Sequence, residues 1–598
     1  MFQVFKKLYA LLSKSERHRA KLVFLLMLGT AFLEMLGVAS IMPFVGVLAT
    51  PGVVESNEYL AAANQWLGFE EPRNFLIFLG VVVLVLFVSS LVFKALTAYA
   101  VLRFANMRSH AFCYRLLRGY LAQPYSFFLG RNTADLSKTL FSEVNEVING
   151  GLIPALKVMS GSIVSLMIVL LLLKVEPLLT LVVGIVLGGA FSTIYVLSRR
   201  YLQRIGKQRV EANQQRFLLA NESLNGIKEL RLMGREPSYL KRFHEASERF
   251  ASYQATSKAL GDIPSFAIQA IAFGGVLVLV LYLMGRYGGL EGALPLIALY
   301  AFAGYRLLPA FQEIFKNSTQ LRFYGAALDS LHADLVSMPE LDPVEQVEAT
   351  GVRLSGDIRL EQVSFQYASA VKPALNGLTL CIPKGTSAAF VGTTGAGKST
   401  VVDLILGLLE PSSGSIQIGN ELLHGASLKA WQRNIGYVPQ AIYLADASIA
   451  ENIAFGVPKS EIDMQAVERA AQAAHIHDFI AGQLPDGYRT HTGERGVRLS
   501  GGQRQRIGIA RALYHNPEIV VFDEATSALD NATEAAVMQA VNELRGEKTI
   551  ILIAHRLSTV ERCDTIFMLE CGALCASGTY QELIAASEAF GRLANFSS

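Results

Sequence analysis

Long apolar runs alternate with long, charged stretches over the first half of the chain. Each apolar run holds about 20 residues, the length of helix that crosses the roughly 30 Å of hydrocarbon in a bilayer. The pattern predicts an α-helical membrane domain over residues 1–336, with an interfacial helix at its start and six transmembrane helices. The predicted spans are residues 22–44, 75–96, 152–173, 178–197, 263–284 and 293–311.

The charge of the segments between the spans predicts their orientation. Four glutamates lie between residues 55 and 71, after the first span, whereas the segment after the second span is rich in arginine from Arg103 to Arg131. Basic residues gather on the cytoplasmic side of membrane proteins, so both termini are predicted to be cytoplasmic. Polar connections such as residues 199–243 keep a helical period, which predicts that the helices continue beyond the bilayer.

The first 21 residues are basic and amphipathic. In a helix, one apolar face would hold Phe2, Phe5, Leu8 and Leu12, with Lys6, Lys7 and Lys14 turned toward lipid headgroups. This pattern indicates either a helix lying on the inner membrane surface or a simple basic flank of the first span. No short apolar core with a small-residue cleavage site is present here, so a cleaved signal peptide is not predicted.

The pattern changes after the sixth predicted span. Residues 337–356 are acidic and contain proline, which is typical of a linker. Over residues 357–598, short β-rich runs alternate with helical ones, and the stretch is long enough to hold its own core. The runs "SAAFVG" and "EIVVFDE" end in polar residues, as buried strands of an α/β sheet do. An α/β domain is therefore predicted to follow the membrane domain.

Composition agrees with a membrane protein. Hydrophobic residues make up 52% and charged residues 17% of the chain, which is too apolar for an ordinary soluble protein of 598 residues. The 53 basic and 50 acidic side chains nearly balance, so the net charge gives no reason to expect a nucleic-acid partner. The five cysteines form no cluster with histidine at metal-ligand spacing, which favours a reducing compartment and argues against a zinc site.

The stretch "FVGTTGAGKST" follows an apolar strand, precedes a helical run, and fits the pattern G-x-x-x-x-G-K-[ST]. Glycines let backbone N–H groups turn toward phosphate oxygens, Lys398 would reach the terminal phosphates, and Ser399 would ligate Mg²⁺. The residues predicted to bind ATP here are Gly392, Thr393, Thr394, Gly395, Ala396, Gly397, Lys398, Ser399 and Thr400.

Two carboxylates end a later strand, "IVVFDE". Asp523 is predicted to join Ser399 in the Mg²⁺ shell. Phosphoryl transfer to water needs an oriented nucleophile, and Glu524 beside the metal ligand is placed to accept its proton.

The stretch "LSGGQ" directly precedes a strongly helical segment. Backbone donors of Ser500, Gly501 and Gly502 would lie at a helix N-terminus, where they can bind an anion. A single nucleotide site does not need a second phosphate-binding helix start. This additional phosphate-binding helix start predicts that two copies close face to face, each completing the other's nucleotide site.

Together these motifs resemble the ABC transporter family, in the arrangement of an exporter half-transporter, and the resemblance covers essentially the whole chain. It implies an ABC ATPase domain, ATP and Mg²⁺ as cofactors, and a homodimer with two working sites. It implies catalytic roles for Glu524, His555 and Gln440, a place for Gln440 in the Mg²⁺ shell, adenine stacking by Tyr367, and nucleotide contacts by Gln503 and Asp530. Residues 492–496, "TGERG", are similar to an exporter segment that lies near the coupling helices.

Within the membrane domain, "FLEMLGVASIMPFVGVL" and "NESLNGIKELRLMGRE" resemble the PglK-type flippases, which move lipid-linked oligosaccharides across a bacterial inner membrane. The segment "ESNEYLAAANQWLG" is expected to form a short surface helix, as in those proteins. Ser265 and Glu313 stand where such a lumen could be basic, so the substrate stays open. Two alternatives remain: a broad exporter of lipids, drugs or peptides, and an ATP-driven membrane regulator or channel.

One carboxylate, Glu34, interrupts the first predicted span, where a charged side chain is costly. Thr30 and Glu34 share a helical face that is predicted to point into the bundle. We expect Glu34 to pair with a basic residue, and the alternative is a protonated, hydrogen-bonded carboxyl. Arg103 and Arg306 are either cations of the pore wall or interfacial anchors, and Pro43 is expected to loosen the helix.

Overall fold

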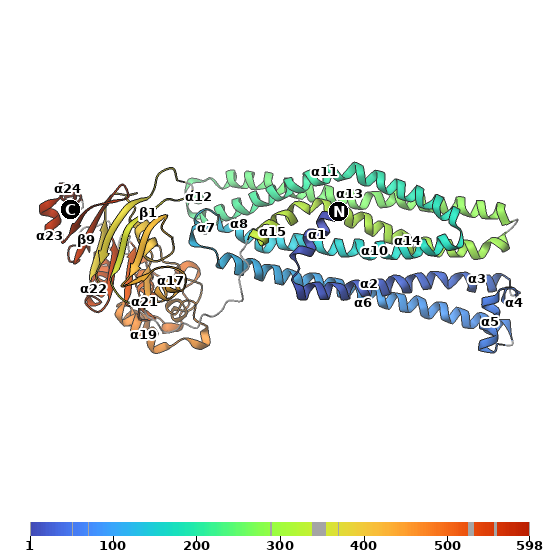
Figure 1. Ribbon diagram of the computed structural model, residues 1–598, viewed down its shortest axis with the longest axis horizontal. Helices are drawn as coiled ribbons and strands as arrows, with labels where there is room; N and C mark the ends of the chain where they lie inside the picture. Colours follow the sequence, from blue (N-terminus) through green and yellow to red (C-terminus); the bar gives the residue numbers. More distant parts are fainter. Residues whose placement is uncertain are drawn as a thin grey trace. The chain divides into compact units, whose positions relative to one another are not determined.

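The computed structural model describes residues 2–50, 52–69, 71–287, 290–337, 354–368, 370–523, 531–554 and 559–596 (Figure 1). The chain divides into two compact units. The first comprises Met1–Gln123 and Gly130–Leu341, and the second comprises Pro124–Leu129 and Asp342–Ser598. Every strand that the structure describes lies in the second unit. Most of the predicted linker lies outside the described residues.

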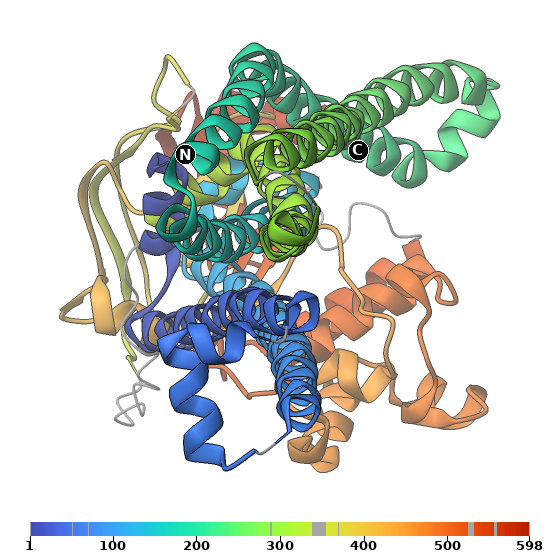
Figure 2. The same ribbon diagram turned by 90° about the vertical axis from the view of Figure 1, so that its right-hand side faces the viewer.

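In the described part of the first unit, six helical segments are long and apolar enough to cross a membrane, as predicted. The first segment is split into α2 (Lys14–Ala39) and α3 (Ile41–Ala49). The others contain α6 (Pro72–Leu121), α10 (Ile153–Val175), α11 (Pro177–Asn225), α13 (Glu236–Tyr287) and α14 (Leu290–Phe323). Seen end-on in Figure 2, the blue helices α2 and α6 lie together, and the green α13 and α14 pack with the teal α11.

The long helices extend well past the thickness of a bilayer. α6, α11 and α13 hold 50, 49 and 52 residues. At 1.5 Å per residue each is about 75 Å long, more than twice the hydrocarbon thickness, which confirms the predicted extensions. The loosening expected at Pro43 takes the form of a break: α2 ends at Ala39, since proline offers no N–H to the Ala39 carbonyl one turn earlier.

Shorter helices complete the first unit. They are α1 (Phe2–Leu11), α4 (Val53–Ser56), α5 (Glu58–Leu67), α8 (Thr133–Ser137), α9 (Val144–Val147), α12 (Ile227–Met233) and α15 (Gly325–Ser337), with π-helical turns at Lys138–Glu143 and Ile148–Leu152. α5 is the predicted short helix between the first two spans. The Asn57 side chain caps its start by accepting the Leu60 N–H, and Gly68 ends it at φ 69°.

The N-terminal helix α1 forms, but its surroundings differ from the prediction. It packs against α15, and Lys7 pairs with Asp329 of α15 at 2.6 Å. Leu8 and Leu12 are buried inside the protein. At Leu8 and Leu12 the predicted apolar face is therefore buried within the protein, where α15 packs against α1. The choice between a surface helix and a basic flank stays a prediction.

The second unit contains two sheets. An antiparallel sheet has the order β2 (Leu375–Ile382), β1 (Ile358–Phe365), β4 (Ser413–Ile418) and β5 (Glu421–Leu422). The other sheet has the order β10 (Ala573–Gly578), β9 (Thr565–Glu570), β3 (Ser387–Val391), β8 (Thr549–Ile553), β7 (Ile519–Asp523) and β6 (Ile435–Val438). In this second sheet all pairings are parallel except β10 with β9.

Helices flank these sheets and complete the α/β architecture that the sequence predicted. They are α16 (Lys398–Ile405), α17 (Gly425–Gln432), α18 (Ile449–Ile453), α19 (Met464–Ala473), α20 (His477–Gln483), α21 (Gly501–Leu513), α22 (Asn531–Glu543), α23 (Tyr580–Ala586) and α24 (Glu588–Phe596), with single 3-10 turns at Lys459–Glu461, Gly487–Arg489 and Glu494–Gly496. The short helix α7 (Tyr125–Leu129), from the first half of the chain, also belongs to this unit.

Strand β3 is buried on both faces, which explains its unbroken apolar run. Ala388 and Phe390 belong to the core shared with the antiparallel sheet, while Ala389 and Val391 belong to the core under α18, α19 and α21. Successive side chains of a strand point to opposite faces, so one strand serves two cores. β3 is thereby fixed as the central support of the loop that follows it.

Candidate functional site

Four neighbouring parallel strands present their carboxyl ends at one edge of the sheet, in the order β3, β8, β7, β6. Three of these strands carry predicted site residues at or just after their carboxyl ends. Gly392 follows β3, Asp523 ends β7, and Gln440 comes two residues after β6. The carboxyl edge of a parallel sheet is where such folds bind ligands. The structure therefore brings together residues that the sequence placed at separate strand ends.

The loop after β3 has a backbone that only glycine adopts without strain. Gly392 and Gly397 have φ of 147° and 101°. A Cβ at Gly392 would lie 2.2 Å from the Leu569 carbonyl oxygen, and one at Gly397 would lie 2.9 Å from the Ala374 carbonyl oxygen. Two close backbone approaches thus shape the loop into a cradle at the N-terminus of α16, where N–H groups favour an anion.

Lys398 lies inside this cradle. The residue is buried, and its ammonium donates to the carbonyl oxygens of Gly392 at 2.8 Å and Thr393 at 3.2 Å. The loop thereby holds a cation beside the N-terminal N–H groups of α16, which is the donor set that a nucleotide phosphate needs. Ser399 is exposed next to it, with a hydroxyl oxygen of the kind that Mg²⁺ accepts as a ligand.

Carboxylates gather on the other side of the cradle. The Tyr437 hydroxyl donates to Asp523 at 3.2 Å. Burial, and then the nearby charge of Asp523, raise the pKa of Asp403 on α16 to about 6. Two carboxylates that repel each other create a place that favours a cation, so this arrangement fits Mg²⁺. Sequence reasoning missed Asp403, although it lies one helical turn after Ser399 and shares its face.

Tyr367 lies just beyond β1 and is half-buried. Its ring packs edge-on against Phe365 with centroids 4.9 Å apart, and its hydroxyl lies 3.1 Å from the Thr400 hydroxyl. Because Thr400 belongs to α16, the tyrosine is held beside the phosphate cradle. This position suits an aromatic ring that stacks on the base of a bound nucleotide.

The "LSGGQ" stretch starts helix α21 as predicted. Ser500 is its N-cap: its hydroxyl accepts the Gln503 N–H at 3.2 Å, while the Gln503 side chain accepts the Ser500 N–H at 2.8 Å. This capping box fixes the first turn. Ser500 and Gly501 are exposed, whereas Gly502 is buried, so the helix start faces outward.

The "TGERG" segment is anchored at its first residue. Thr492 is buried, and its hydroxyl donates to the Ala445 carbonyl at 2.9 Å.

Of the other predicted site residues, Gln440 is exposed. Glu524, Asp530 and His555 lie outside the described residues.

Comparison with known proteins identifies the family. Residues 375–527 match the ABC transporter family, and residues 23–291 match the ABC transporter transmembrane region. An ATP-dependent lipid A-core flippase of Cupriavidus pinatubonensis is 30% identical over 484 residues, covering 79% of this chain and 80% of the relative. The chain belongs to the ABC transporter family. ATP binding, and ATP hydrolysis coupled to transport across a membrane, follow from this membership.

Other members of the family are also similar to this chain. A lipid A-core flippase of Chromohalobacter salexigens is 34% identical over 430 residues, with 71% of each chain covered. Mouse mitochondrial ATP-binding cassette sub-family B member 10 is 31% identical over 78% of this chain and 66% of its own length. A solved bacterial Atm1-family ABC exporter with ATP bound has a TM-score of 0.76 at 24% identity, covering 97% and 98% of the two chains. This transporter therefore has the exporter fold.

In the membrane domain of the transporter, Glu34 is almost fully buried, with 2% of the residue exposed. Its carboxylate lies 3.1 Å from the Lys94 ammonium of α6 and 3.5 Å from the Arg306 guanidinium of α14. Arg306 also donates to the Ser90 hydroxyl at 3.1 Å and lies over the Phe87 ring at 4.9 Å. The prediction that Glu34 pairs with a basic residue of another helix is confirmed.

Arg306 is a paired cation inside the bundle rather than an interfacial anchor. Only 7% of its side chain is exposed, because α2 and α6 supply its partners. Arg103 is exposed on α6 and donates to the Tyr99 hydroxyl at 3.3 Å.

A polar cavity of about 650 Å³ lies between α6, α10, α13 and α14. Its lining consists of Lys94, Asn149, Ile153, Pro154, Lys157, Gly261, Asp262, Ser265, Pro309, Gln312, Glu313, Lys316, Asn317 and Gln320. Ser265 and Glu313, which stand where a PglK-like lumen could be basic, are both part of this lining. Three lysines supply that charge from other positions, which the sequence pattern did not reveal.

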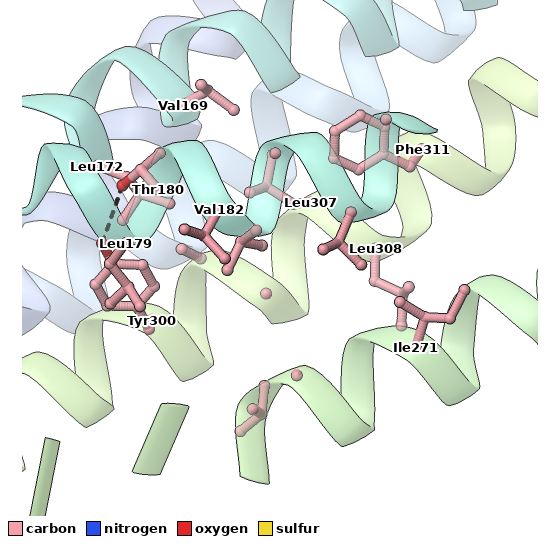
Figure 3. A pocket seen from close by; sticks show the side chains of 18 of the residues that line it. Val169, Leu172, Leu179, Thr180, Val182, Ile271, Tyr300, Leu307, Leu308 and Phe311 are labelled. Carbon is pink, nitrogen blue, oxygen red and sulfur yellow. Dashed lines mark hydrogen bonds between the residues drawn. The ribbon is translucent and has the colours of Figure 1, made fainter. Parts of the chain in front are cut away.

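A second cavity of about 640 Å³ is apolar and is lined by α10, α11, α13 and α14 (Figure 3). Valine and leucine side chains of these helices surround it, together with Phe311. At one end of the cavity, two polar groups of the lining, the Thr180 and Tyr300 hydroxyls, are hydrogen-bonded to each other at 3.0 Å, as Figure 3 shows. The cavity suits a hydrocarbon chain.

Proposed function

We propose that two copies of this transporter form a homodimeric, ATP-driven flippase for a lipid with an anionic polar head. The membrane is the bacterial inner membrane, with both termini and the ATPase domain in the cytoplasm. The domain boundaries we propose are residues 1–336 for the membrane domain, 337–356 for the linker and 357–598 for the ATPase.

The observation that carries this proposal is that the two cavities follow one another along the same three helices. On α14, Phe311 lines the apolar cavity and the next residue, Gln312, lines the polar one. On α13, Ser265 lines the polar cavity and Ile268 the apolar one. A polar, lysine-bearing space directly beside an apolar space matches a molecule with a charged head and a hydrocarbon body.

At the ATPase, the residues of the cradle bind the phosphates while Tyr367 receives the adenine. Ser399, Asp523 and Gln440 would hold Mg²⁺, which neutralises negative charge on the phosphate being transferred. Glu524 takes the proton of the attacking water, and His555 contacts the γ-phosphate. Ser500, Gly501, Gly502 and Gln503 of one copy, with Asp530, complete the site of the other copy.

Two lipid classes have support. The lipid A-core flippases among the relatives support a lipid A-type substrate. The PglK-like stretches and the short helix α5 support a lipid-linked oligosaccharide. Both substrates combine an anionic phosphate-bearing head with apolar chains, which is the chemistry that the paired cavities fit.

The test is ATP-dependent lipid translocation in proteoliposomes. The transporter is reconstituted with a polyprenyl-pyrophosphate oligosaccharide, lipid A, phosphatidylcholine or a hydrophobic drug, and Lys398→Ala serves as the inactive control. We expect an anionic lipid to stimulate hydrolysis and to change leaflet. Stimulation by uncharged drugs alone would instead identify a broad exporter. Hydrolysis with no movement of any compound would identify a regulator or channel.

A further inference from the structure

Every lysine of the polar cavity has a carboxylate partner on a different helix. Lys157 of α10 lies 3.0 Å from Glu313 of α14, and Lys316 of α14 lies 2.9 Å from Asp262 of α13. Lys94 is held by Glu34 at 3.1 Å. Cavity lysines that served only to attract an anion would bind it better without these carboxylates, since each one competes for the same ammonium group.

Two of these ion pairs act on one helix. Glu313 and Lys316 are three residues apart, so they share a face of α14. One reaches Lys157 on α10, and the other reaches Asp262 on α13. α14 is therefore tied to both neighbouring helices from a single turn that lines the cavity.

These two ion pairs, which we call the ties of α14, are accessible to solvent and weak. The four side chains of the two pairs are between 42% and 55% exposed, in contrast to the 2% of Glu34. Half-exposed pairs contribute little to stability, and a phosphate monoester carries more negative charge than one carboxylate and has three acceptor oxygens. An anion that enters the cavity can therefore replace the carboxylates as the partner of both lysines. Gln312, Asn317 and Gln320 offer further hydrogen bonds beside them.

We infer that the phosphate-bearing head of the transported lipid binds Lys157 and Lys316 by displacing Glu313 and Asp262, and that this exchange releases α14 from α10 and α13. The inference rests on the proposed flippase function and adds a trigger to it. A ligand shifts a conformational equilibrium only by its preference for one state, and here the preference arises because the lysines are free only when the ties are broken. Neutral lipids lack this preference and leave the ties in place.

The experiment compares Glu313→Gln and Asp262→Asn with the wild type, each as the full-length dimer in phosphatidylcholine nanodiscs. The probe is dioctanoyl phosphatidic acid, and dioctanoylglycerol is its uncharged counterpart. Removing a competing carboxylate is expected to tighten binding of the anionic probe about two- to fivefold and to raise the rate of ATP hydrolysis measured without the probe. Lys157→Gln and Lys316→Gln are expected to weaken its binding about tenfold. Binding of dioctanoylglycerol should not change in any variant.

A matched control and a double variant separate exchange from a structural role. Asp329→Asn breaks a lysine ion pair in the same unit, away from the cavity, and should not alter anion binding. The gain from Glu313→Gln should vanish when Lys157→Gln is also present, because that lysine is what Glu313 withholds.

The experiment distinguishes failure of the proposed exchange from failure of the proposed flippase function. If the wild type moves anionic lipid but Glu313→Gln and Asp262→Asn bind the probe no more tightly, the exchange is refuted while the flippase stands. If the wild type neither binds nor moves any anionic lipid, the proposed function itself fails and the exchange fails with it.

Discussion

Replacing Glu34 by glutamine tests whether the membrane bundle depends on a buried ion pair. The substitution leaves the Arg306 guanidinium buried with a neutral partner, since only 7% of that side chain is exposed. Removing one partner of a buried pair costs about 3–5 kcal/mol. Glutamine can still accept a hydrogen bond, and Arg306 keeps Ser90, so we expect a loss of stability near the lower end, about 3 kcal/mol. Lys94 contributes little to this loss because its side chain is 55% exposed.

The assay is unfolding of the purified transporter in mixed micelles of increasing SDS content, followed by far-ultraviolet circular dichroism. Arg306→Met alone should also destabilise the protein, whereas Glu34→Leu combined with Arg306→Met should cost about 1 kcal/mol or less, because an apolar pair can replace a buried ion pair. Arg103→Met, an exposed arginine of α6, is the matched control and should stay within about 0.5 kcal/mol of the wild type. Single losses below about 1 kcal/mol that simply add in the double variant would refute this reasoning.

Three predictions concern the ATPase. Lys398→Ala should abolish ATP hydrolysis in a phosphate-release assay, with the fold retained. Gly397→Ala places a Cβ 2.9 Å from the Ala374 carbonyl at φ 101°, so ATP affinity measured by titration should fall at least tenfold. The pKa of Asp403 is raised to about 6 in the folded protein, above its value of about 4 in an unfolded chain. Its contribution to the free energy of unfolding is therefore present below about pH 4 and is lost as the pH rises to about 6. Asp403→Asn should therefore gain thermal stability over the wild type at pH 7.5 and little at pH 4.5, and an equal gain at both would contradict this.

The sequence predicted features that depend on local rules. An apolar run of about 20 residues has few alternatives to a membrane span, and the break before Pro43 follows from a missing N–H. The cradle at Gly392 and the carboxylate at Asp523 were predicted because buried strands end where their apolar runs end, and parallel strands bring those ends to one edge. Asp403 could have been found by the same reasoning, from its helical spacing after Ser399.

The polar cavity could not be predicted in the same way. Lys157 and Lys316 lie near the ends of predicted spans, where lysine ordinarily anchors a helix at the headgroups, and no local pattern shows that they face one cavity. The partners of Arg306 could not be predicted for a related reason. Its position depends on which faces of α2 and α6 meet α14, and helix packing is set by side chains that are distant in the sequence.

Glu34 joins the stability of the bundle to the charge of the cavity. Its one carboxylate is shared by Arg306, which is buried, and Lys94, which also lines the polar cavity. The other two lysines of the cavity each have a carboxylate of their own, so the resting cluster around the cavity carries an excess of one positive charge. When a phosphate head displaces Glu313 and Asp262, Lys157 and Lys316 pair with that head instead. Glu34 stays in place because Arg306 holds it away from solvent. The carboxylate that is costly in the first span thus holds two cations in the membrane and, unlike Glu313 and Asp262, is not displaced by the anion.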